Sequence, residues 1–340
     1  MIPTAIFLLV LFVITLTVAA YSTYGERKVA AFMQDRIGPN RAGPFGLLQP
    51  LADGGKMFMK EDFVPASANR TLYFLGPAVA MTTALITGVV IPWGGTLQFG
   101  DVSVSLQGIN PEIGILFVFA MVGIGVYGIM LGGWASNNKF SLLGAIRAAS
   151  QMVSYELAMG LSIVALVMMN GTLSLGGIVD YQVEHGWNII RQPLGFLIFI
   201  VCAFAEANRA PFDMPECETE LVGGYHTEFS SMKLGFYLFA EYVNMFISGA
   251  VMATLYFGGY DVPGLASTGW DPNLITIIGV AAMFAKTFFF IFFFMWVRWT
   301  LPRFRFDQLM NLGWKGLIPL AILNILLTGG VMLALGQLAP

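Results

Sequence analysis

Long apolar runs separated by short polar segments dominate the chain. A helix that crosses the core of a bilayer needs about 20 predominantly apolar residues. The pattern therefore predicts an all-α polytopic membrane protein with about eight spans, of which the fifth is short enough to be a broken or partly spanning helix. The predicted spans are Ile2–Tyr24, Thr71–Trp93, Ile113–Trp134, Ala148–Met169, Leu194–Ala207, Leu234–Phe257, Leu274–Val297 and Leu317–Leu338.

The composition agrees with this pattern and excludes several classes of protein. Hydrophobic residues make up 57% of the 340 residues, and charged residues only 11%, against about 25% in an average soluble domain. An ordinary soluble enzyme, a nucleic-acid binder with a basic face and a disordered chain are all excluded. We expect residues 1–340 to form a single integral membrane domain.

The distribution of basic residues predicts the orientation. Fifteen of the 17 Lys and Arg lie in the segments 25–70, 135–147, 208–233 and 298–316. Since basic loops stay on the cytoplasmic side, these segments are predicted to be cytoplasmic, with both termini on the outer, periplasmic side. The membrane would be a bacterial inner membrane, with the mitochondrial inner membrane as the alternative. The opposite loops, 94–112, 170–193 and 258–273, are interpreted as plain connectors.

The first cytoplasmic loop has the pattern of a surface helix. Leu47, Leu51 and Phe58 lie near helical spacing, and Pro50 fits only in the first turn of such a helix. The pattern predicts an amphipathic helix on the membrane surface. The alternative is a basic loop that binds anionic headgroups.

Four ionisable residues fall inside the predicted spans or at their ends. Glu156, Glu206 and Glu241 are carboxylates, and Lys286 lies near the middle of the seventh span. Such groups are costly within a membrane and indicate function by default. A chain of buried carboxylates can relay protons, because burial disfavours their charged form. The alternative is a purely structural ion pair, for example between Glu241 and Lys286.

The third and last cytoplasmic loops also carry a dense set of polar groups. Residues 206–220 are acidic, and Pro211 and Pro215 prevent one regular helix there. A solvated acidic loop is one interpretation, and a loop folded into the protein or under a partner is the other. Residues 298–310 alternate Arg with aromatic residues. The two Cys and two His show no ligand spacing, so we expect no metal site.

Four motifs in this chain resemble the quinone-channel membrane subunit of respiratory complex I, the NADH:quinone oxidoreductase. They are ERKV at 26–29 with RIGPNRAGPFGLLQPLAD at 36–53, QMVSYE at 151–156, EANRAPFDMPE at 206–216 with GYHTE at 224–228, and WVRWTLPRFRFDQLM at 296–310. They extend over nearly the whole chain. Two positions depart from the usual pattern, Cys217 in place of Ala and Phe306 in place of Tyr.

The resemblance implies a function that composition alone does not show. The chain would help form the quinone chamber and begin the proton path that couples quinone reduction to proton translocation. It would bind no cofactor itself. Quinone, either ubiquinone or menaquinone, would be the substrate, and FMN and iron–sulfur clusters would lie on partner subunits of the peripheral arm. Its other partners would be membrane-arm subunits and the lipid bilayer, with no nucleic acid.

The resemblance also assigns roles to residues. The proton path would contain Glu156, Glu206 and Glu241, and the acidic coupling loop would contain Asp213, Glu216, Glu218, Glu220 and Glu228. The quinone chamber would be lined or braced by Arg27, Arg36, Asp53, Arg209, Arg298 and Arg303. A membrane subunit of an energy-converting hydrogenase is the alternative, and a stand-alone cation/proton antiporter is a more distant one.

Overall fold

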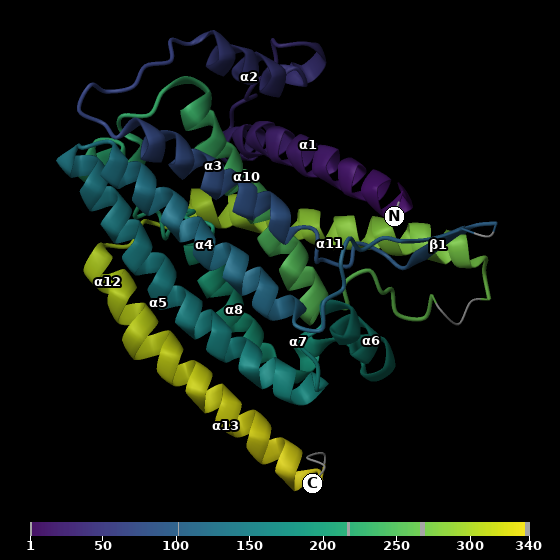
Figure 1. Cartoon of the computed structure of the whole chain (residues 1–340). Helices are drawn as coiled ribbons and strands as arrows, with labels where there is room; N and C mark the ends of the chain where they lie inside the picture. Colours follow the sequence, from purple (N-terminus) through teal and green to yellow (C-terminus); the bar gives the residue numbers. More distant parts are fainter. Residues whose placement is uncertain (1, 101, 216–217, 266–268, 337–340) are drawn as a thin grey trace.

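The computed structural model describes residues 2–100, 102–215, 218–265 and 269–336. This part of the chain is predominantly helical (Figure 1). The longer helices are α1 (Ile2–Met33), α3 (Arg70–Thr87), α4 (Gly114–Ala135), α5 (Lys139–Asn170), α8 (Pro193–Glu206), α10 (Ser231–Tyr256), α11 (Pro272–Thr300) and α13 (Ile318–Ala334). The shorter elements are α2 (Gln49–Met59), α6 (Leu175–His185), α7 (Asn188–Arg191), α9 (Glu218–Leu221), α12 (Phe306–Asn311), the 3-10 turns η1 (Pro44–Gly46) and η2 (Gly224–His226), and the π-helical turn η4 (Leu312–Leu317).

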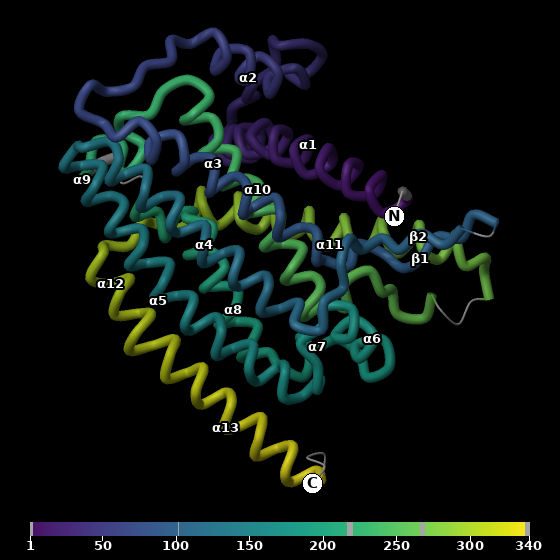
Figure 2. The backbone as a smooth tube through the Cα atoms, viewed as in Figure 1, coloured from purple at the N-terminus to yellow at the C-terminus, as the bar shows by residue number. Residues whose placement is uncertain are grey.

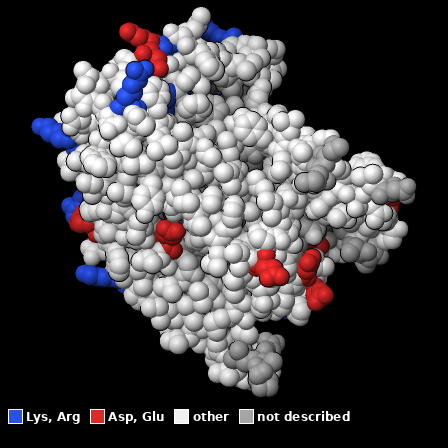
Figure 3. Space-filling model, in the orientation of Figure 1, with Lys and Arg blue, Asp and Glu red and all other residues white. Residues whose placement is uncertain are grey.

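Within the described residues, six helices are long and apolar enough to cross a membrane, which confirms the all-α polytopic fold. They are Pro3–Met33, Gly114–Ala135, Lys139–Asn170, Ser231–Tyr256, Pro272–Thr300 and Phe306–Ala334. The predicted spans in α3 and α8 correspond to helices of only 18 and 14 residues, so the count of eight stays a prediction. Most of the face seen in Figure 3 carries no charged side chain, as lipid contact requires.

Small residues let the helices of the bundle approach closely. A Cβ on Gly128 of α4 would lie 2.9 Å from the carbonyl oxygen of Gly76 on α3, and one on Gly133 would lie 2.4 Å from the Cβ of Ala145 on α5. Glycine at these positions is therefore required by the approach of the backbones, as is common in membrane helix pairs. Helix α5 packs against α4 and α8, and α10, the most buried of the candidate spans, packs against α3 and α11 (Figure 1).

The predicted surface helix is confirmed as α2. It has Pro in its first turn, and Leu51 and Phe58 are 69% and 73% exposed. Figure 1 shows α2 above the end of α1, apart from the main bundle. Hydroxyls at the start of α10 hold this segment, because Ser231 donates to the carbonyl oxygen of Met57 at 3.0 Å and Ser230 to that of Glu61 at 3.1 Å.

Two of the three loops interpreted as plain connectors, 94–112 and 170–193, contain regular secondary structure. Residues 94–112 form a two-stranded antiparallel hairpin, β1 (Thr96–Phe99) with β2 (Val102–Ser105), which Figure 2 shows beside α11. The side chain of Asn273, at the start of α11, accepts from the backbone N–H of Gln98 and donates to its carbonyl, both at 2.8 Å. Residues 170–193 form α6 and α7, which hold the end of α10 through buried Gln182.

Candidate functional site

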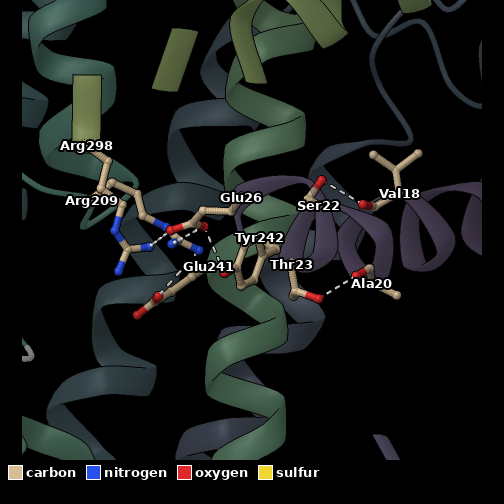
Figure 4. Close-up of polar contacts among 9 residues, drawn as sticks. All are labelled: Val18, Ala20, Ser22, Thr23, Glu26, Arg209, Glu241, Tyr242 and Arg298. Carbon is tan, nitrogen blue, oxygen red and sulfur yellow. Dashed lines mark hydrogen bonds and ion pairs between the residues drawn. The ribbon is translucent and has the colours of Figure 1, made fainter. Parts of the chain in front are cut away.

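A buried carboxylate, Glu26, joins four elements at one end of the bundle (Figure 4). It lies on α1 and is 5% exposed. Arg298 of α11 donates to its Oε1, Arg209 from the loop after α8 donates to its Oε2 at 3.2 Å, and the Tyr242 hydroxyl of α10 donates to the same oxygen at 2.9 Å. Two cations and a phenol therefore stabilise one buried anion.

Arg209 extends this network further into the bundle. Its guanidinium lies 3.9 Å from Oε2 of Glu241 and 4.1 Å from the centre of the Tyr242 ring. Burial works against the charged form, but Tyr242, Glu26 and Glu241 together raise the pKa of Arg209 well above its ordinary value. Arg209 therefore remains a fixed positive charge between two carboxylates, and the Tyr225 hydroxyl donates to the second of them, Glu241, at 3.4 Å.

Glu241 and Glu206 lie on the wall of one internal cavity of about 70 Å³. Further polar groups of its lining come from Thr83, Thr87, Asn208, Tyr225, Tyr237, Asn244 and Ser248. At roughly 15 Å³ of such volume for each molecule, the cavity has room for a few waters. Oε2 of Glu206 is buried and has no hydrogen-bond partner among the described residues. A polar cavity with an unpaired carboxylate oxygen is suited to hold water that exchanges protons.

Glu156 reaches the same region from α5. A Cβ on Gly123 of α4 would lie 3.1 Å from its Oε1, so glycine leaves the room that this carboxylate occupies. Glu156 is also close enough for its charge to act on the Glu206 carboxyl. Glu206 and Glu241 of the predicted proton path therefore share one cavity, whereas Glu156 is half-buried on α5 and lies outside the cavity lining.

The amide of Gln151 fixes the loop that carries Arg209. It is fully buried on α5 and donates to the carbonyl oxygens of Ala205 and Phe212, each at 2.7 Å. One side chain thus ties the end of α8 to the loop beyond it.

Replacing Gln151 with leucine is expected to destabilise this part of the protein by about 2–4 kcal/mol, because two buried carbonyls lose their donor. The measurement is the thermal unfolding midpoint of the detergent-purified assembly. Ser150→Ala is the control, since the hydroxyl of Ser150 bonds only within its own helix among the described contacts. Equal midpoints for the two variants would contradict the role of Gln151.

The acidic loop is tied to the bundle through several of its predicted groups. Arg303 donates to the backbone carbonyl of Asp213 and lies 3.8 Å from its carboxylate. Arg147 forms an ion pair with Glu220 at 2.6 Å, and Asn138 donates to Glu228 at 2.6 Å. These contacts favour a loop folded against the bundle. Glu216 and Cys217 lie outside the described residues, and Glu218 begins α9.

Phe306 has a partner although it lacks a hydroxyl. The guanidinium of Arg147 lies 5.4 Å from the centre of its ring. At this distance a cation is attracted to an aromatic face. The same arginine therefore contacts both α12 and the acidic loop.

The remaining chamber residues lie near the end of α1. Arg27 forms an ion pair with Asp53 of α2 at 2.7 Å. Arg27, Arg36 and Trp299 line a hollow of about 330 Å³ at the surface, between the ends of α1 and α11. The structure thus divides the six predicted chamber residues into this hollow, the Glu26 network with Arg209 and Arg298, and the contact of Arg303 with Asp213.

Lys286 does not pair with Glu241, so that structural alternative is wrong. Its ammonium donates to the carbonyl oxygens of Phe257, Gly259 and Asp261 at 2.7, 2.8 and 2.6 Å. Glu241 precedes Phe257 by some four turns of helix, or about 24 Å at 1.5 Å per residue. Lys286 instead stabilises the carboxyl end of α10, where a cation is favoured by the helix dipole.

Sequence reasoning missed Glu26 and Tyr242 as site residues. A signal for Glu26 exists, because Thr15, Ala19, Ser22 and Glu26 follow one another at helical spacing. All four are buried. This small and polar stripe marks the face of α1 that meets α10 and α11.

Fold and site together define a polytopic helical membrane protein with a buried ionic network that leads to a carboxylate-lined cavity. Residues 5–329 match the model of the protein family described as NADH dehydrogenase. The chain is 66% identical to the first H subunit of NADH-quinone oxidoreductase from Cytophaga hutchinsonii, over 95% of this chain and 94% of that protein. It is 59% identical to the H subunit of the same enzyme from Flavobacterium johnsoniae, over 97% and 95%, and 49% identical to that from Leptospira biflexa, over 92% and 90%.

The chain therefore belongs to the NADH dehydrogenase family, and it matches H subunits of NADH-quinone oxidoreductase along nearly its whole length. This confirms the family indicated by the four motifs. It also confirms the assignment to a proton-translocating oxidoreductase complex, complex I, of which the chain is a membrane subunit.

Proposed function

We propose that this chain forms part of the quinone chamber of the complex and the first part of the path that couples quinone reduction to proton translocation. The single observation that supports this most strongly is the bridge made by Arg209. One buried guanidinium contacts both Glu26, at the end of the bundle where the predicted chamber residues lie, and Glu241, on the wall of the internal cavity.

The chemistry of the substrate suggests how the bridge acts. Reduction of a quinone to a quinol takes up two electrons and two protons, so it changes the charge in the chamber. Electrons would arrive through the flavin and iron–sulfur clusters of partner subunits in the peripheral arm. A change of charge near Glu26 alters the field at Arg209, and a displaced Arg209 alters the stability of the charged form of Glu241. Glu241 and Glu206 would then exchange protons through water in the cavity, and Glu156 would continue the path from α5.

The acidic loop is proposed as the element that both the quinone chamber and the carboxylate-lined cavity influence. It carries Arg209, which contacts the network, and Asp213, which contacts Arg303. Coupling between two sites requires a shared element with two arrangements. We place the protein in a bacterial inner membrane, with both termini on the periplasmic side, next to peripheral-arm and membrane-arm subunits.

Replacing Arg298 with alanine tests the chamber. Glu26 then loses one of its two cations, and charge-assisted hydrogen bonds contribute about 1.5–3 kcal/mol, so kcat/KM for quinone is expected to fall about 10- to 100-fold. The measurement is NADH-driven quinone reduction over a range of quinone concentrations.

The matched control is Arg305→Ala, which removes an arginine of the same loop whose pair with Asp307 is exposed. It is expected to leave quinone kinetics near those of the unaltered enzyme. Unchanged kinetics in Arg298→Ala would remove Arg298 from the chamber.

A further inference from the structure

A second buried polar cluster lies at the opposite end of α8 from Glu206. Gln192, at the start of α8, donates to the hydroxyl of Thr328 at 2.7 Å, and Asn324 of α13 donates to the side-chain oxygen of Gln192 at 3.1 Å. Gln192 and Asn324 are each 4% exposed. Gln192 nevertheless stands between the exposed residues Arg191 and Pro193 in the chain. The cluster therefore begins next to the surface and extends into the bundle.

Two features distinguish this cluster from a set of bonds that only hold helices together. The hydroxyl of Tyr256 is fully buried, and Ser162 is the neighbouring side chain with which it can share a hydrogen bond. The hydroxyl of Ser162 itself donates to the carbonyl of Met159. A Cβ on Gly195 would lie 3.2, 3.4 and 3.6 Å from the polar atoms of Asn324, Gln192 and Tyr256. Three polar groups thus converge where α8 lacks a side chain. Buried waters in proteins are bound by converging polar groups of this kind.

One face of α8 connects this cluster to the cavity. Gly195, Phe199, Cys202 and Glu206 follow at intervals of four, three and four residues, so they share that face. The distance from Gly195 to Glu206 is about 16 Å at 1.5 Å per residue. The face is polar at its two ends and apolar between them.

Phe199 separates the two polar regions. Its side chain lines the cavity that contains Glu206, and its ring lies 5.6 Å from the ring of Tyr256. It is 3% exposed. An apolar constriction between two hydrated regions stops conduction by excluding water. Phe199 is in the position that such a constriction requires.

We propose that the Gln192–Asn324–Thr328–Tyr256 cluster is the outer half of a proton path through this subunit, and that Phe199 is the gate between it and the Glu206 cavity. The conducted species is the proton, passed along water and hydroxyl groups, each step breaking one O–H bond and forming another. The inference rests on the proposed function, since it uses Glu206 as the inner end of the path. Its test requires no turnover and is therefore separate from the test of Glu206 in catalysis.

The experiment measures passive proton leak in the whole complex. The purified complex is placed in liposomes that contain a pH-sensitive dye, with potassium and valinomycin to clamp the potential, and an external pH step is applied without NADH. We expect Phe199→Ala to raise the leak several-fold, because water can then join the two regions. Phe199→Val, a smaller truncation, provides a second variant if the first does not assemble.

The matched control is Phe204→Ala on the same helix. Phe204 is equally buried, but its ring packs 4.2 Å from Phe294, away from the cavity. The complex with Phe204→Ala is expected to show the same passive proton leak as the unaltered complex. Adding Asn324→Leu to Phe199→Ala is expected to return the leak to the level of the unaltered complex. An assembled Phe199 variant without leak, a leak of equal size in Phe204→Ala, or a leak that persists with Asn324→Leu would each overturn the proposal.

Discussion

Replacing Arg209 with methionine is expected to reduce quinone reductase activity to a few per cent or less of its original value. Arg209 is 4% exposed and lies between Glu26 and Glu241. Removing one partner of a buried ion pair costs about 3–5 kcal/mol, because an uncompensated charge stays behind. The loss applies to both carboxylates, so the chamber and the cavity wall are disturbed together.

The measurement compares two activities of the same membranes. NADH oxidation with quinone is expected to be lost, whereas NADH oxidation with an artificial acceptor that takes electrons before the membrane arm is expected to persist if the complex is assembled. Arg209→Lys is the conservative comparison. It keeps the charge but loses the planar fork that reaches two carboxylates, so partial activity is expected. Full activity in Arg209→Met would show that quinone reduction does not need the contacts of Arg209 with Glu26 and Glu241.

The second large effect is expected for Glu206→Gln, which should lower the number of protons pumped per electron. Glutamine has nearly the same shape as glutamate but does not titrate. Glu206 lies at the end of α8 on the cavity wall, with one carboxylate oxygen unpaired among the described residues. Because the proposed path runs through this group, proton translocation should fall further than electron transfer.

The control for this variant is Glu184→Gln. The side chain of Glu184 is 77% exposed on α6, far from the cavity in the fold. Its removal is expected to leave the proton-to-electron ratio unchanged. Glu156→Gln is expected to behave as Glu206→Gln does, since Glu156 belongs to the same proposed path. A proton-to-electron ratio equal to that of the unaltered complex in both variants would show that Glu206 and Glu156 are not part of the proton path.

Local pattern is sufficient to predict several elements. The apolar runs predict the long helices, and apolar spacing with an early Pro predicts α2. The three path carboxylates can be chosen because an ionisable group in an apolar helix is unusual. Each of these inferences depends on residues within a few turns of one another.

Features that depend on distant parts of the chain are not predictable in this way. Glu26 and Arg298 are 272 residues apart in sequence, and nothing local to either indicates the other. Lys286 lies within a predicted span, yet it bonds to carbonyls beyond the end of α10, because a long flexible side chain can reach a polar region some way along the helix. The hairpin of β1 and β2 is only four residues long on each side, which is too short for a strong strand pattern.

The most direct measurement of the central claim follows carboxyl protonation while the quinone is reduced. Redox-triggered infrared difference spectra of the purified complex report the C=O stretch of protonated carboxyl groups. The account predicts a band of this kind that changes on quinone reduction, that is absent in Glu206→Gln, and that is altered in Arg209→Lys. Carboxyl bands that change in the same way in all three proteins would contradict a path in which Arg209 links quinone chemistry to the carboxylates of the cavity.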